Sequence, residues 1–369
     1  MSTGFEIIGY TKSGTQIVLT NRVVDLVILK TQDSITPSFT FTFKIDDDLQ
    51  VSQDFFMLKD IEIFWTIPKS LSFKEADEFI TAKLYVSDIS TQSIGLLTAA
   101  DTDTSQKDES TPRYLDTKIV CYLQDALIAK ESISLFSEQV STEKLLRDIV
   151  KRPKYISPPT LSTLKNVFIP SMDRLSALSY VVCTYGTYDS PVFASYDIDG
   201  FHLYALKDTQ PTRLKFVYLP NPVSSRVPQD SIPIRMVQSF YSASIRSFYS
   251  PSTIPAIDYS HTTLYTSKSI KYQTNHLHEQ LVGSTLFGAP QRLKHLYDEL
   301  FLEGNTLMIQ TDFMIDPRTL VLGTKVEFFT DETRFAHLQG VYVLTLVTYS
   351  LLLSGRPRVR IDLKLNRQE

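Results

Sequence analysis

Four of the six histidines are candidates for metal binding, because neutral imidazole is a common ligand of zinc and copper. His276 and His278 are two positions apart, and His261 and His295 lie elsewhere in the chain. A pair with this spacing is not specific for a metal site, and ordinary surface histidines are the alternative. We predict no bound metal and no cofactor.

The run Asp197-Ile198-Asp199-Gly200 resembles the beginning of a calcium-binding loop, in which ligand oxygens alternate along the chain. It lacks the third acidic position and the closing glutamate of such a loop. A tight turn between two strands, with Gly200 at a positive φ, accounts for the same residues. We therefore predict a hairpin turn over 197–200.

Three glutamates, Glu131, Glu138 and Glu143, could include the two carboxylates that a glycosidase places across its cleft. Their spacing in the sequence does not give the distance between their carboxyl groups, and an exposed charged face is the alternative. The chain contains no Gly-x-Ser-x-Gly, no Walker loop, no Gly-x-Gly-x-x-Gly and no Cys-x-x-Cys. We predict a protein that is not an enzyme.

Arg292, Lys294 and His295 could form a small basic face on a helix predicted over 290–302. The whole chain has 37 Lys and Arg against 41 Asp and Glu, a formal charge of −4. This balance argues against a protein whose main task is to bind nucleic-acid phosphates. A solvated helix surface or a subunit contact is the favoured interpretation.

The chain has 369 residues, of which 43% are hydrophobic and 21% charged, which predicts a folded protein of about two or three domains. Two distant cysteines, Cys121 and Cys183, favour reduced thiols in a reducing cytosol. We expect no membrane span and no signal peptide, because no long apolar run and no basic-then-apolar start over 1–10 is present. The 22 phenylalanines and 19 tyrosines favour a β-rich assembly protein.

The first third of the chain alternates apolar and polar residues, which is typical of half-buried antiparallel strands. Phe39, Phe41, Phe43 and Ile45 share one face of a strand over 38–45, and strands are also predicted over 61–67, 23–29 and 117–123. The acidic run 46–48 predicts a turn. The polar stretch 98–112 predicts a mobile loop that connects two strands of a long hairpin within the first domain.

The middle of the chain changes to helical spacing. Ser141 is a good N-cap for a helix that ends before Pro153, and a second helix is predicted to open at Ser171. Strands over 192–196 and 201–206 then flank the turn at 197–200, and the helix over 290–302 is the third.

The last sixty residues return to strands. We predict strands over 325–329 and 341–353, a turn at 354–357, and a final strand with an apolar and a charged face. Arg358, Arg360 and Lys364 lie on its charged face, where they are candidate intersubunit contacts, with an exposed strand face as the alternative.

The predicted fold class is α+β, mainly β, with two tube-type antiparallel β-barrel domains that bracket a mixed α+β insertion. The first barrel is predicted to span 1–130, with the loop 98–112 inside it. The mixed domain is predicted to combine 131–205 with 251–300, and the second barrel 206–250 with 301–369.

The order of these elements, and the local stretches 141–150, 169–179, 193–203 and the region from Leu300 onwards, carry a resemblance. The chain resembles the baseplate hub proteins of contractile-tail, T-even-type bacteriophages, which are related to the hub part of type VI secretion spike proteins. The loop 98–112 has no counterpart in this pattern. No lysozyme-like or spike β-helix segment is recognisable in the sequence.

The resemblance implies a homotrimer whose two barrels per subunit form a ring around a channel. Such a ring adapts a sixfold tail tube or tube-initiator protein above to a threefold central spike protein below. It also implies DNA that passes through the lumen without specific binding, to which a net negative charge is suited. The expected location is the virion tail baseplate, assembled in the host cytoplasm and without a membrane. The alternative is a β-rich carbohydrate-active enzyme or carbohydrate-binding module.

Overall fold

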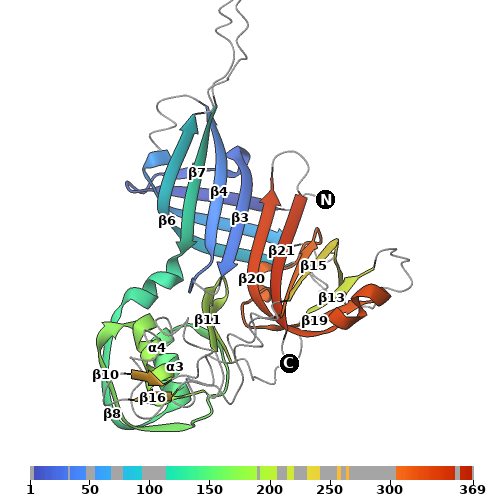
Figure 1. Ribbon diagram of the computed structural model, residues 1–369. Helices are drawn as coiled ribbons and strands as arrows, with labels where there is room; N and C mark the ends of the chain where they lie inside the picture. Colours follow the sequence, from blue (N-terminus) through green and yellow to red (C-terminus); the bar gives the residue numbers. More distant parts are fainter. Residues whose placement is uncertain are drawn as a thin grey trace, which may run out of the picture. The chain divides into compact units, whose positions relative to one another are not determined.

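The computed structural model describes residues 4–31, 34–46, 55–67, 78–93, 114–188, 192–205, 214–219, 231–241, 256–258, 263–265, 305–353 and 358–367 (Figure 1). The chain divides into two units. Unit 1 combines Met1–Leu29, Pro37–Gln124 and Thr348–Arg360, and unit 2 combines Lys30–Thr36, Asp125–Val347 and Ile361–Glu369. Both are therefore assembled from segments that are distant in the sequence.

The sheet of unit 1 is built mainly from the N-terminal third. Its strands are β1 (Phe5–Thr11), β2 (Gln16–Val18), β3 (Val23–Thr31), β4 (Ser38–Asp46), β5 (Leu58–Ile67), β6 (Glu78–Ser93), β7 (Tyr114–Leu123) and the end of β20 (Gly340–Leu352). They follow one another in the order β20-β3-β4-β7-β6-β5-β1-β2. From β3 to β2, every neighbouring pair is antiparallel.

The core of unit 1 lies on one face of this sheet. Phe39, Phe41 and Phe43 are fully buried on β4, as their alternation predicts. The indole of Trp65 on β5 meets the ring of Tyr349 on β20 edge to face, with centroids 5.5 Å apart. Four strands separate β5 from β20 in the sheet order, so the sheet curls strongly around its core.

Unit 2 contains a second large sheet. Its strands are β13 (Leu214–Tyr218), β14 (Ser231–Pro233), β15 (Met236–Tyr241), β18 (Asn305–Thr311), β19 (Lys325–Thr330), β20 and β21 (Arg358–Arg367), in the order β14-β13-β19-β20-β21-β18-β15. β13 runs parallel to both of its neighbours, whereas β18 is antiparallel to β15 and β21. Ile361, Leu363 and Leu365 of β21 are fully buried, as predicted.

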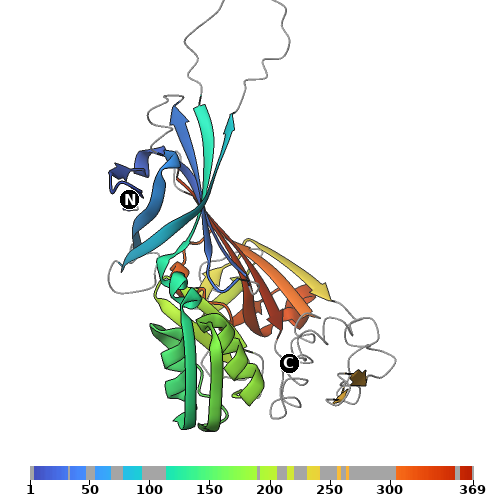
Figure 2. The ribbon, with the colours of Figure 1, turned by 90° about the vertical axis from the view of Figure 1, so that its left-hand side faces the viewer.

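The rest of unit 2 is a mixed α+β region. The 3-10 helix η2 (Gln124–Lys130) leads into β8 (Ser132–Ser141), α3 (Thr142–Val150), β9 (Pro153–Ile156), β10 (Thr163–Asp173), α4 (Arg174–Tyr185), β11 (Val192–Asp197) and β12 (Gly200–Ala205). β8 and β10 form an antiparallel ribbon beside α3 and α4 (Figure 2). β11 and β12 form a hairpin with β9 parallel to β12. A further short pair joins β16 (Ala256–Asp258) to β17 (Thr263–Tyr265).

The prediction of a mainly β fold with antiparallel sheets is confirmed. The predicted barrels are not seen as closed structures among the described strands, because β2, β14 and β15 each end their sheet without a closing partner. β6 and β7 pair antiparallel on either side of the predicted loop, so its position inside a hairpin is confirmed. The loop 98–112, the helix 290–302, the turn 354–357 and residues 47–48 of the acidic run lie outside the described residues.

Two of the predicted helices lie within the described residues. The helix over 142–150 has Ser141 at its N-cap position, as predicted, but the Ser141 side chain makes no capping hydrogen bond. The start of the next helix at Ser171 is wrong, because Ser171 lies in β10 and Met172 pairs with Ile133 of β8. The helix begins at Arg174 instead, with Asp173 as its cap. Besides η2, the described residues contain three 3-10 helices: η1 (Thr20–Arg22), η5 (Pro317–Thr319) and η6 (Thr333–Leu338).

Candidate functional site

Two of the three candidate catalytic carboxylates are paired with arginines. Glu131 Oε2 lies 3.1 Å from Arg174 Nε, and Glu143 Oε1 lies 2.9 Å from Arg147 of the same helix. Glu138 is exposed on β8. No interaction joins one of these carboxylates to another among the described residues, so the structure gives no acid and base pair across a cleft.

The arginine that binds Glu131 has a structural task at the end of α3. Arg174 Nη1 donates to the carbonyl oxygens of Asp148 and Ile149, at 2.9 Å each, and the Tyr196 hydroxyl donates to the carbonyl of Val150. These side chains satisfy carbonyls that have no partner inside the helix. Burial raises the pKa of Tyr196 to about 12, so its hydroxyl stays a donor at neutral pH.

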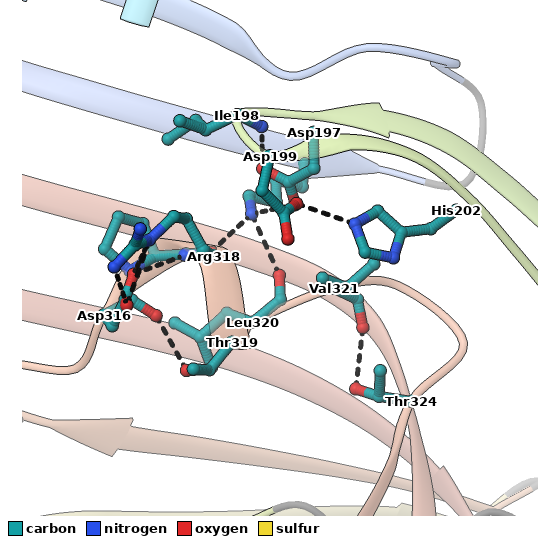
Figure 3. A network of polar contacts seen from close by, with 12 residues as sticks. Asp197, Ile198, Asp199, His202, Asp316, Arg318, Thr319, Leu320, Val321 and Thr324 are labelled. Carbon is teal, nitrogen blue, oxygen red and sulfur yellow. Dashed lines mark hydrogen bonds and ion pairs between the residues drawn. The ribbon is translucent and has the colours of Figure 1, made fainter. Parts of the chain in front are cut away.

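The turn Asp197–Gly200 is part of a buried ion pair. Asp197 Oδ2 lies 2.5 Å from Lys30 Nζ, and the two side chains are 2% and 4% exposed. Lys30 also donates to the carbonyl oxygens of Pro317 (2.7 Å) and Leu320 (3.1 Å) (Figure 3). The second carboxylate oxygen of Asp197 accepts from the N–H of Ile198 at 2.7 Å.

This arrangement explains the acidic turn without calcium. The Lys30 ammonium compensates the charge of the Asp197 carboxylate, and Gly200 has φ +130, a backbone conformation that favours glycine. The predicted hairpin turn is therefore confirmed. Because both charges are buried, removing one partner leaves the other uncompensated, which costs about 3–5 kcal/mol.

The second aspartate of the turn binds a buried histidine. Asp199 Oδ1 lies 2.7 Å from His202 Nε2, and Lys154 Nζ lies 3.8 Å from Asp199 Oδ2. Burial of Asp199 raises its pKa, but the His202 hydrogen bond and the charges of His202 and Lys154 outweigh it and lower the pKa below its usual value. His202 also stacks on the ring of Tyr204.

The turn whose carbonyls accept hydrogen bonds from Lys30 also has internal polar contacts. Asp316 binds Arg318 through paired contacts of 2.7–3.1 Å, and its backbone carbonyl accepts from Thr319. Gly323 has φ +84, and a Cβ there would lie 2.7 Å from Phe193 Cβ on the hairpin. Lys30 and Gly323 thus bring the β11–β12 hairpin tightly against the turn 316–324. These contacts make the site a structural junction between the hairpin and the turn 316–324.

The three candidate intersubunit contact residues of the last strand all lie on β21. Arg358 and Arg360 are exposed on β21, and Lys364 is half-buried. Their role in subunit contacts stays a prediction.

Large apolar side chains on the surface were not predicted from the sequence. Phe136 of β8 and Phe168 of β10 are opposite each other and are 70% and 55% exposed. Phe56 and Met57 are about half exposed on unit 1. Such side chains are common at contact surfaces of assemblies.

The described residues contain no group of three or more His, Cys, Asp or Glu that could hold a metal ion. The candidates His261, His276, His278 and His295, and the basic group Arg292 and Lys294, lie outside the described residues. None of the described helices has the length and apolar character needed to cross a membrane.

Comparison with solved structures identifies similar folds. A tail protein of Neisseria meningitidis matches with a TM-score of 0.56 and 12% identity, over 99% of this chain and 97% of the other. The 43 kDa tail protein of the prophage MuSo2 from Shewanella oneidensis matches with a TM-score of 0.55 and 12% identity over the same shares. The chain has the fold of phage tail proteins.

A component of the Escherichia coli type VI secretion system, described as structurally similar to the phage T4 tail proteins gp27 and gp5, matches at a lower level. Its TM-score is 0.48 with 10% identity, over 94% of this chain and 74% of the other. No protein-family model and no curated protein matches the sequence.

Proposed function

We propose that this protein is a structural component of a phage tail baseplate and acts as its hub. The observation that carries the proposal is the fold shared with two phage tail proteins over 97% or more of both chains. The resemblance of the sequence to hub proteins points in the same direction.

In the proposed assembly, three copies form a ring. Each copy contributes two barrel-like tube domains, and the mixed α+β part is an insertion between them. The curled sheet of unit 1 supports this idea, because a sheet that brings β5 to β20 is close to the curvature of a barrel. Ring formation would also cover exposed edge strands, which can otherwise pair with other chains and cause aggregation.

The proposed partners are a central spike protein below the ring and tail tube or tube-initiator proteins above it. DNA passes through the lumen without specific binding, and the protein resides in the virion tail after assembly in the host cytoplasm. The charged side chains Arg358, Arg360 and Lys364 are proposed to contact a neighbouring subunit. The carbohydrate-active enzyme is disfavoured, since Glu131 and Glu143 are bound to arginines.

Light scattering and particle images test the proposal together. We expect a trimer of about 126 kDa, three times the 42.0 kDa subunit, and annular particles in negative stain. A particle that stays at the subunit mass at high concentration would refute the hub. Activity on polysaccharides that disappears in Glu131→Gln or Glu143→Gln variants would instead support the enzyme.

A further inference from the structure

We draw no further inference here: the strongest candidate, the face of the β8–β10 ribbon on which Phe136 and Phe168 are exposed, carries none because nothing in the described part of the chain shows what covers it.

Discussion

The buried Lys30–Asp197 pair allows a quantitative test of the junction. Asp197→Ala leaves the Lys30 ammonium buried, with only the carbonyls of Pro317 and Leu320 as partners. Lys30→Met leaves the Asp197 carboxylate buried and removes the donor to both carbonyls. We expect each change to lower the free energy of unfolding by about 3–5 kcal/mol, because an uncompensated charge remains in an apolar interior.

The double variant Lys30→Met/Asp197→Leu removes both charges. It still leaves two backbone carbonyls without their donor, which costs about 1–3 kcal/mol for each buried group that finds no water. The double variant should nevertheless be less destabilised than the sum of the single variants by about 1–3 kcal/mol. This difference measures the coupling between the two side chains.

Urea unfolding at one fixed protein concentration, followed by far-ultraviolet circular dichroism, gives these free energies. Hydrogen exchange of residues 192–205 and 316–324 shows whether the loss is centred on the junction. Single variants that cost less than about 1 kcal/mol would contradict the burial argument, since exposed ion pairs have that value. The coupling argument would be contradicted if the double variant were destabilised by the sum of the two single variants to within about 0.5 kcal/mol.

Three further outcomes are expected. Asp173→Ala should lower the free energy of unfolding by about 0.5–2 kcal/mol, because α4 loses its cap. Hydrogen bonds from Ser176 lower the pKa of Asp173, so its contribution to stability is complete above the unfolded pKa of about 3.9 and is lost as the pH falls through the folded pKa. Unfolding of the wild type and the variant, measured at a series of acidic pH values, will show this loss. Gly323→Ala should cost about 1–3 kcal/mol more than Gly14→Ala in thermal melts, because both glycines have positive φ but a Cβ at Gly14 meets nothing within 4 Å. Burial raises the pKa of the Cys121 thiol far above its ordinary value, so iodoacetamide should modify Cys121 only in urea; rapid labelling of the native protein, mapped by mass spectrometry, would contradict its burial.

Strands with a strict apolar alternation were predictable from the sequence. On β4 and β21 the side-chain period of two decides which face is buried, and Phe41 and Leu363 lie where that period places them. β8 was not predicted as a strand, although Ile133 and Leu135 alternate with serines. No residue of β8 is fully buried, and the exposed Phe136 directly follows Leu135, so the apolar alternation is interrupted.

The junction was only half predictable. The glycine at position 200 indicates a turn, and the structure has one. The partner of Asp197 could not be found from the sequence, since Lys30 is 167 residues away and follows the apolar run 26–29 of β3. A lysine in that setting is the one available signal, because lysine is seldom fully buried without a partner.

The division of the chain has a consequence for biosynthesis. Trp65 belongs to the first third of the sequence, but the ring that packs on it, Tyr349, is translated almost at the end. The N-terminal part of unit 1 therefore leaves the ribosome before the end of β20, which completes its core, has been translated. During this interval its apolar face is open, so we expect newly made chains truncated before residue 348 to need chaperones, while full-length chains become protease-resistant soon after release.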